Sequence, residues 1–250
     1  MFASLTREQS PAPPLETQSV FALPIHLCRD YAAWVRSRLE AGQGTHIVTL
    51  NAEMAMLADQ TPQLAQVIQQ ADLVVPDGAG VVFYLKLRRY SQTRCPGIEL
   101  AAALIEAIGT AEQPGKIIFY GAAPGVAEQA AQVWRDRYPA LEIITQNGYL
   151  DDSQAADFAE FLATEQPQLI LVGLGVPRQE YWIAQHRQHC PQATWVGVGG
   201  SLDIWAGIKL RAPVWLRENN LEWFYRLYKE PWRWRRMLVL PKFAWAALWR

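Results

Sequence analysis

Residues 169–180 read Leu-Ile-Leu-Val-Gly-Leu-Gly-Val-Pro-Arg-Gln-Glu, and this stretch shows the change from an apolar run to a helical pattern that recurs along the chain. A continuous apolar run ends at Gly173, a glycine-containing loop follows, and helical periodicity begins at Arg178. Continuous apolar runs are typical of strands in parallel sheets, because helices bury such strands on both faces. The stretch therefore predicts a strand, a loop and a helix of a wound α/β fold.

The same alternation recurs along the chain and predicts a Rossmann-like, mostly parallel sheet with helices on both faces. The expected strands are residues 46–51, 72–76, 116–121, 141–146, 169–173 and 194–198. Helical periodicity lies between them, for example at residues 97–108, 125–138, 153–165 and 178–189. We expect one α/β domain at residues 21–214, after a flexible leader at residues 1–20.

Composition excludes several classes of protein. Half of the 250 residues are apolar and the formal net charge is −1, so neither wholesale disorder nor a global nucleic-acid footprint is predicted. A membrane-spanning helix needs about 20 apolar residues, and no apolar run is that long. The three cysteines lack CxxC spacing, which argues against a disulfide framework or zinc cluster and favours a reducing compartment.

The C-terminal stretch differs from the rest of the chain. Residues 221–250 carry seven Lys and Arg against two Glu, and they hold five of the 11 Trp residues. Trp together with Lys and Arg is typical of segments that lie at a membrane surface. The alternative is a helix packed on the core, with Glu222 and Arg226 as an ordinary i,i+4 pair. We expect residues 215–250 to form a helical appendage that contacts the membrane through residues 221–250.

Candidate catalytic residues lie where strands end, which is where ligands bind in this fold class. Thr49 and Asn51 are at the exit of the first expected strand, and Asp77 follows the second. Asp77 is interpreted either as a cap of the helix that begins near Gly78 or as a general base. Asn51 is equally suited to cap the helix that follows it. If the two strands are neighbours, both side chains flank one crevice.

The glycine loops complete no standard nucleotide fingerprint. Gly173 and Gly175 have the GxG spacing, but Arg178 occupies the third glycine position of a dinucleotide motif. Neither GxxxxGK[ST] nor DxD occurs, so we predict no metal and no cofactor. Glycine still allows a backbone to approach a ligand, and helix N-termini attract phosphates. The glycines expected to bind substrate are Gly121, Gly175, Gly199 and Gly200.

Other polar residues have both an ordinary and a functional interpretation. Arg94 lies in an aperiodic loop, where a solvated arginine is the default and a phosphate partner is the alternative. Glu180 is an ordinary acidic residue at a helix start. Gln179 is less expected there and indicates a hydrogen bond to a ligand hydroxyl.

These motifs, in this order, resemble the WecG/TagA/CpsF family of bacterial glycosyltransferases over roughly residues 20–245. The matching pieces are Thr49-Leu50-Asn51-Ala52-Glu53, Pro76-Asp77-Gly78, residues 173–180, Gly197-Val198-Gly199-Gly200, Ala206-Gly207, Arg211-Ala212-Pro213 and Leu221-Glu222-Trp223-Phe224-Tyr225-Arg226. Two positions depart from the pattern: Arg94-Cys95-Pro96-Gly97 is a looser match, and Lys is commoner than Arg178.

The resemblance implies an inverting transferase with two substrates. The donor is a UDP-sugar that carries N-acetylmannosamine or its uronic acid, and the acceptor is polyprenyl-diphosphate-linked N-acetylglucosamine. The implied place is the inner face of the cytoplasmic membrane, in surface polysaccharide or cell-wall polymer synthesis.

The resemblance also implies roles for individual residues. Asp77 is the implied catalytic base, with Thr49, Asn51, Arg94 and Gln179 at active-site positions. The appendage arginines implied to complete the substrate pocket are Arg226, Arg233 and Arg236, and the motif around residues 173–180 adds Arg178 and Glu180 to the substrate-binding set.

The residues themselves agree with this chemistry. A single Asp without a metal pair suits a one-step displacement, in which the base takes the acceptor hydroxyl proton. Arginines and helix N-termini would then stabilise the departing UDP. Three alternatives stay open: a nucleotide-sugar-binding regulatory module, a transferase for another UDP-hexose, and a dinucleotide-dependent oxidoreductase that the incomplete fingerprint disfavours. The sequence fixes neither the donor sugar nor the oligomeric state, so a homo-oligomer stays open, and it predicts no nucleic-acid partner.

Overall fold

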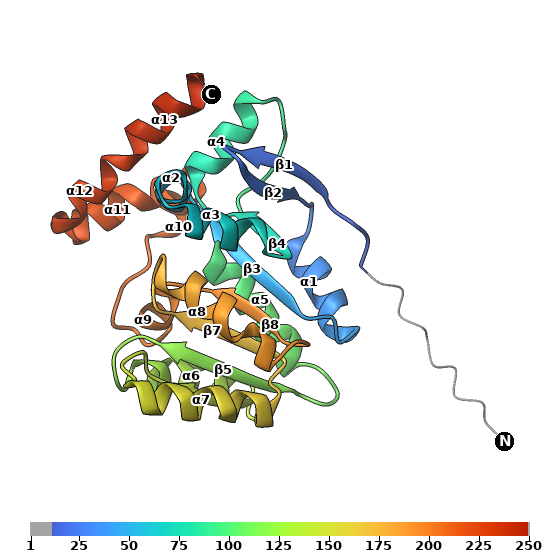
Figure 1. The fold of residues 1–250 in the computed structure, drawn as a ribbon. Coiled ribbons are helices and arrows are strands. Elements are labelled where there is room, and N and C mark those ends of the chain that lie inside the picture. Colours follow the sequence, from blue (N-terminus) through green and yellow to red (C-terminus); the bar gives the residue numbers. More distant parts are fainter. Residues whose placement is uncertain (1–11, 250) are drawn as a thin grey trace.

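The computed structural model describes residues 12–249, and a six-stranded parallel sheet forms its centre (Figure 1). The strand order is β4-β3-β8-β7-β5-β6, and every neighbouring pair is parallel. The strands are β3 (Thr45–Leu50), β4 (Leu73–Pro76), β5 (Lys116–Gly121), β6 (Glu142–Gln146), β7 (Leu169–Gly173) and β8 (Thr194–Gly197). The six predicted strands are confirmed, each with ends within about one residue of the expectation.

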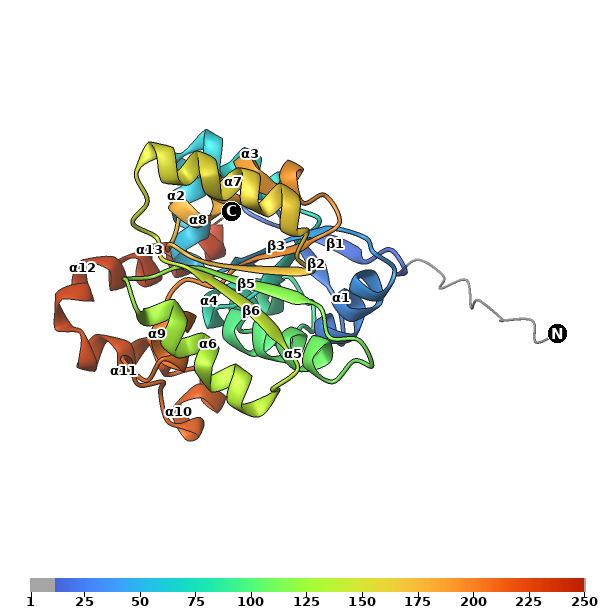
Figure 2. The same cartoon turned by 90° about the horizontal axis from the view of Figure 1, so that it is seen from below.

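Helices cover both faces of the sheet, as Figure 2 shows, because alternate strand residues point to opposite sides. One face carries α1 (Tyr31–Glu40), α5 (Gly97–Gly109), α6 (Val126–Arg137) and α9 (Ser201–Trp205). The other carries α2 (Ala52–Gln60), α3 (Pro62–Gln69), α7 (Asp152–Glu165) and α8 (Arg178–His186), with η1 (Arg187–His189) after α8. The helix α4 (Ala79–Leu87) packs beside β4 and α2. The predicted Rossmann-like α/β fold is confirmed.

An antiparallel hairpin precedes this domain and corrects one boundary. Strand β1 (Glu16–Val20) pairs with β2 (Leu23–Leu27) in a separate two-stranded sheet. The expected flexible leader is therefore wrong for residues 16–20. Only Val20 of β1 is buried, so the sequence of this strand has no apolar pattern that could have predicted it. Residues 1–11 of the expected leader lie outside the described residues.

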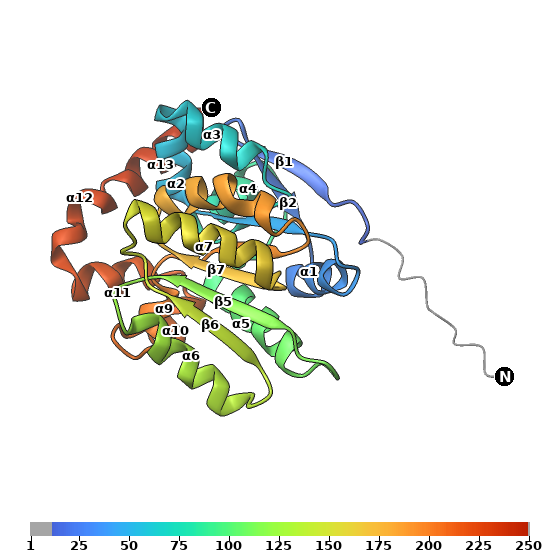
Figure 3. The ribbon, with the colours of Figure 1, turned by 60° about the horizontal axis from the view of Figure 1, so that its bottom comes forward.

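The C-terminal appendage lies at the edge of the sheet toward which the strands point (Figures 1 and 3). It comprises α10 (Val214–Glu218), α11 (Glu222–Lys229), η2 (Pro231–Arg233), α12 (Trp234–Met237) and α13 (Val239–Trp249). The last helix, α13, packs against α2 and α4 through the buried Phe243, whose ring lies 5.0 Å from that of Phe21 and 6.4 Å from that of Tyr84. The packed-helix interpretation therefore holds for α13. No helix within residues 12–249 is both long enough and apolar enough to span a bilayer.

Candidate active site

The chain leaves the neighbouring strands β3 and β8 toward opposite faces of the sheet. After β3 the chain enters α2 on one face of the sheet, whereas after β8 it enters α9 on the opposite face. A divergence of this kind opens a crevice beyond the carboxyl ends of the strands, where ligands bind. Thr49 bridges the two strands here, because its buried hydroxyl donates to the carbonyl oxygen of Gly197 at 3.2 Å.

Asn51 and Asp77 flank the same strand ends, because β3 and β4 are parallel neighbours. The backbone N–H of Asp77 donates to the carbonyl oxygen of Leu50 at 2.9 Å. Oδ1 of Asn51 accepts the N–H of Met54 at 2.9 Å, so Asn51 caps α2 as one interpretation expected. A Cβ added at Gly78 would lie only 3.0 Å from the Cβ of Asn51, which explains how the two strand exits come so close.

Asp77 caps a different helix from the one expected. Its Oδ1 accepts the backbone N–H of Gly97, the first residue of α5, at 3.2 Å. Gly78 is the N-cap of α4, and the described residues give that helix end no side-chain cap. The interpretation of Asp77 as the cap of α4 is therefore wrong. A Cβ added at Gly97 would lie 3.0 Å from Cγ2 of Thr49, so the start of α5 brings Asp77 and Thr49 to one place.

Gln179 is buried and makes its hydrogen bonds within the protein. Its Oε1 accepts the backbone N–H of Gly175 at 3.2 Å and that of Gly199 at 3.0 Å. Its Nε2 donates to Oε1 of Glu180 at 2.9 Å. Gln179 thus joins the glycine loops that follow β7 and β8. The geometry favours a role in shaping the crevice rather than the expected hydrogen bond to a ligand hydroxyl.

Glu180 is a buried carboxyl group beside the sheet. The residue is 1% exposed, and its Oε2 has no hydrogen-bond partner within the described part of the chain. Burial raises the pKa of Glu180 to about 7, against the smaller opposite effect of the hydrogen bond from Gln179. Its Oε1 would lie 3.0 Å from a Cβ added at Gly197. Glu180 is therefore an interior group next to the crevice, not an ordinary exposed residue of a helix start.

The four predicted glycines occupy two kinds of environment. Gly121 has φ +123°, and a Cβ there would lie 2.6 Å from the carbonyl of Gly173, so close strand packing already requires this glycine. Gly175 has φ +74°, and a Cβ there would meet no described atom within 4 Å. Gly199 and Gly200 are nearly as open, with nearest contacts at 4.0 and 3.7 Å. Three of the four glycines therefore border open space where a ligand could approach.

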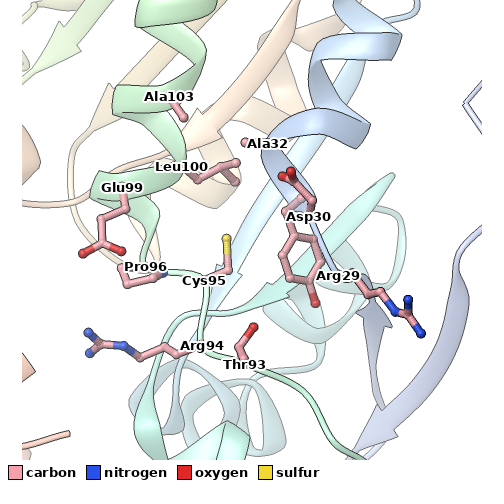
Figure 4. A pocket seen from close by; sticks show the side chains of 11 residues that line it. Arg29, Asp30, Ala32, Thr93, Arg94, Cys95, Pro96, Glu99, Leu100 and Ala103 are labelled. Atoms are coloured by element: carbon pink, nitrogen blue, oxygen red, sulfur yellow. The ribbon is translucent and has the colours of Figure 1, made fainter. Parts of the chain in front are cut away.

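Two of the arginines predicted to bind substrate belong to the α/β domain, and they lie at different parts of the sheet edge. Arg178 is exposed at the first position of α8, and its charge opposes part of the increase that burial causes in the pKa of Tyr120. Arg94 lines a cavity of about 210 Å³ between α1 and α5, and Figure 4 shows its guanidinium on the same side as the carboxylate of Glu99. The lining residues are Arg29, Asp30, Tyr31, Ala32, Thr93, Arg94, Cys95, Pro96, Glu99, Leu100 and Ala103. Burial raises the pKa of Cys95 to about 12, which keeps this thiol protonated.

Ion pairs join the appendage and the segment before it to this edge. Nη1 of Arg94 lies 3.3 Å from Oε2 of Glu222 in α11, and Nε of Arg236 in α12 lies 2.6 Å from Oε1 of Glu53 in α2. Oε1 of Glu99 lies 2.5 Å from Arg211 and 3.3 Å from Arg217. The side chains of Arg226 and Arg233, also expected at the pocket, lie outside the described residues.

From the sequence we expected no site role for Glu53 or Glu99, and for Glu222 only an ordinary i,i+4 pair with Arg226. Two of them, Glu53 and Glu222, stand inside the quoted motifs Asn-Ala-Glu and Leu-Glu-Trp, and that position was the available signal. Within residues 12–249, no three His, Cys, Asp or Glu side chains gather as a metal site requires. The expected absence of a metal stays a prediction.

Comparison with known proteins places this arrangement in a family. The model of the "Glycosyl transferase WecG/TagA/CpsF family" matches residues 18–250. The chain belongs to this family. It is thus a glycosyltransferase, and the enzyme class expected from the motifs is confirmed.

This glycosyltransferase has relatives named N-acetylglucosaminyldiphosphoundecaprenol N-acetyl-beta-D-mannosaminyltransferase. The protein of that name from Bacillus spizizenii strain W23 is 41% identical over 214 residues, which cover 84% of this chain and 81% of the relative. The one from Bacillus subtilis strain 168 is 37% identical over 80% of this chain and 78% of the relative. The one from Staphylococcus aureus strain MW2 is 34% identical over 81% and 80%.

Proposed function

We propose that this glycosyltransferase moves an N-acetylmannosaminyl group from a UDP-sugar to polyprenyl-diphosphate-linked N-acetylglucosamine, with inversion at the transferred sugar. The relatives' names support the acceptor and the transferred group. The observation that carries the proposal is the position of Asp77. Its carboxylate is held by the N–H of Gly97 beside Thr49, at the exits of two neighbouring strands.

Asp77 acts as the general base. It takes the proton of the acceptor hydroxyl while that oxygen forms its bond to the anomeric carbon of the donor. The bond between the anomeric carbon and the phosphate oxygen breaks, and its electron pair leaves with UDP. The departing diphosphate gains negative charge, which nearby arginines can stabilise. Arg94 and Arg236 reach the carboxyl edge of the sheet in the described residues and are suited to that task.

The appendage provides contact with the membrane that holds the acceptor, at its inner face. Most of its aromatic side chains are exposed, although Tyr225 is half-buried and the buried Phe243 anchors α13. Trp and Tyr side chains favour the headgroup region of a bilayer, and basic residues are attracted to anionic lipid. The exposed aromatic residues are Trp215, Trp223, Phe224, Tyr228, Trp232, Trp234, Trp245 and Trp249.

A UDP-release assay tests the function. The protein is incubated with a lipid-diphosphate N-acetylglucosamine acceptor and, in separate reactions, with the UDP derivatives of N-acetylmannosamine, N-acetylmannosaminuronic acid, N-acetylglucosamine and glucose. We expect acceptor-dependent UDP release with the N-acetylmannosamine donor and a β-linked disaccharide product. Release with only another donor would correct the sugar. Donor binding without acceptor-dependent release from any of the four would contradict transfer and favour a regulatory module.

A further inference from the structure

Arg94 and Glu222 form an ion pair between the core and the appendage. The two residues are 128 positions apart in the chain, and the side chains are 16% and 11% exposed. Removing either charge would leave the other largely buried without its partner, which is strongly unfavourable. The pair is therefore a fixed feature of the docked appendage.

The backbone beside Arg94 is also fixed. The N–H of Cys95 donates to the carbonyl oxygen of Pro76 at 2.8 Å, so this loop runs alongside the end of β4, one residue before Asp77. With its backbone held there, Arg94 depends on its side-chain partners for orientation. A guanidinium has five N–H donors, and Glu222 is 3.3 Å from Nη1. Donors of the other nitrogens can then serve a second anion.

The other ion pairs of this region are more exposed than the one between Arg94 and Glu222. Arg236 and Glu53 are 51% and 37% exposed, and Glu99, the partner of Arg211 and Arg217, is 48% exposed. Exposed ion pairs contribute little, because water and salt screen them. Among the described ion pairs that join residues 209–237 to the sheet edge, the pair of Arg94 and Glu222 is therefore the best suited to hold the Arg94 side chain in place.

We propose that Glu222 is a positioning residue for transfer. Its carboxylate holds the guanidinium of Arg94 in the orientation that receives the donor diphosphate, and the same contact places α11 at the carboxyl edge of the sheet. This inference rests on the proposed function, since it gives Arg94 the diphosphate of a UDP-sugar as ligand. Glu222 itself touches no reacting atom and acts through Arg94.

A double-mutant cycle tests this with UDP as the probe. The affinity of the full-length protein for UDP is measured by calorimetry for the wild type, Glu222→Gln, Arg94→Gln and the double variant. We expect Glu222→Gln to weaken UDP binding at least about tenfold. The double variant should bind no more weakly than Arg94→Gln alone, because a residue that acts through Arg94 has no effect once Arg94 is gone. In transfer assays Glu222→Gln should raise KM for the donor more than it lowers kcat.

The matched control is Glu218→Gln, which removes an exposed glutamate four positions earlier in the chain. It should leave UDP affinity unchanged. Near-UV circular dichroism checks the fold of each variant. If Glu222→Gln does not fold, Glu222→Asp decides, because it keeps the charge and shortens its reach, and we expect UDP affinity to fall several-fold.

Three results would overturn the inference: wild-type UDP affinity in the folded Glu222→Gln or Glu222→Asp protein, losses from the two single variants that add in the double variant, or an equal loss in Glu218→Gln. These results are distinct from failure of the proposed function. That function fails if the wild type releases no UDP in the presence of acceptor, and UDP binding by the wild type separates the two cases.

Discussion

The backbone N–H of Gly97 donates to Oδ1 of Asp77 at 3.2 Å, so the first residue of α5 orients the carboxylate at the end of β4. One carboxylate oxygen therefore has a structural task, whatever else the side chain does. An asparagine can perform the same task, because its Oδ1 accepts a hydrogen bond equally well. It cannot accept a proton at neutral pH. The variant Asp77→Asn therefore distinguishes the helix-capping role of Asp77 from its proposed role as general base.

We predict that Asp77→Asn lowers the rate of transfer at least ~10²-fold, the lower range for loss of a general base. Donor affinity and thermal stability should change little, because the hydrogen bond to Gly97 is kept. Initial rates of UDP release and calorimetric titration with UDP measure the two effects.

The matched control for this exchange is Asp151→Asn. Asp151 also caps a helix, since its Oδ1 accepts the N–H of Gln154 at 2.9 Å at the start of α7. It is remote from the strand exits of β3 and β4. Transfer by this control should equal that of the wild type, and near-wild-type turnover of Asp77→Asn would refute the assignment of the base.

Stability should depend on pH through Glu180. Burial raises the pKa of Glu180 from its ordinary 4.5 to about 7, so between these values the folded protein holds a proton that the unfolded chain has released. The contribution of Glu180 to stability is therefore full below pH 4.5 and is lost as the pH rises to about 7. Glu180→Gln is neutral at every pH. We expect its stability relative to the wild type to increase from pH 4.5 to 8 by on the order of 3 kcal/mol.

Urea unfolding of both proteins at pH 5 and pH 8 measures this difference. The comparison is needed because His46 titrates in the opposite sense. Burial lowers the pKa of His46 to about 4, so its contribution to stability is lost as the pH falls below 6.5. The contribution of His46 cancels between the two proteins. An equal pH dependence for both would contradict the assignment of a buried, proton-binding Glu180.

Transfer should not require a divalent metal. Arg94 and Arg236 at the sheet edge are suited to stabilise the charge that a metal stabilises in other transferases. We expect equal initial rates of UDP release with and without EDTA. Complete loss with EDTA that Mg²⁺ or Mn²⁺ restores would reveal a metal requirement.

Membrane contact should depend on the outer side of α13. The rings of Trp245 and Trp249 lie 5.7 Å apart and are 66% and 74% exposed. We expect Trp245→Ala/Trp249→Ala to reduce cosedimentation with anionic liposomes several-fold, because two interfacial anchors are lost. Tyr149→Ala is the control, since Tyr149 is also 74% exposed but lies in the loop before α7.

Equal sedimentation of the double tryptophan variant and the control would argue against α13 as the anchor. These point variants are preferable to truncation after Asn220. Truncation would remove Phe243, which is buried against Phe21 and Tyr84, and would expose the core of α2 and α4. Loss of binding by a truncated protein would then have two explanations.

The central sheet could be predicted because most of its strands are apolar runs buried on both faces, with the edge strand β6 as an exception. The hairpin could not be predicted, because the sequence of β1 is mostly polar and the strand is recognised only by its pairing with β2. The approach of Asn51 to Asp77 could be predicted only conditionally, since sequence does not tell which strands are neighbours. The strand order supplied that condition.

Other features of the site depend on contacts that no local pattern contains. The pair of Arg94 and Glu222 joins residues 128 positions apart. The hydrogen bond that Gly97 donates to Asp77 likewise comes from the backbone of a helix 20 residues later, not from the adjacent helix that a capping rule indicates. A glutamine at position 179 indicated a hydrogen bond, but only the fold shows that the bonds come from Gly175 and Gly199 in the loops after β7 and β8.

The rings of Phe21, Tyr84 and Phe243 fasten the last helix to the hairpin at the beginning of the domain. On its other side, the appendage starts from α10, where Leu216 is buried. The segment between Leu216 and Phe243 is packed on the core at both ends, so it cannot rotate away from the sheet about a single hinge. Glu222 is paired with Arg94 between these two points, so any opening over the strand ends is confined to the residues between Glu222 and Phe243.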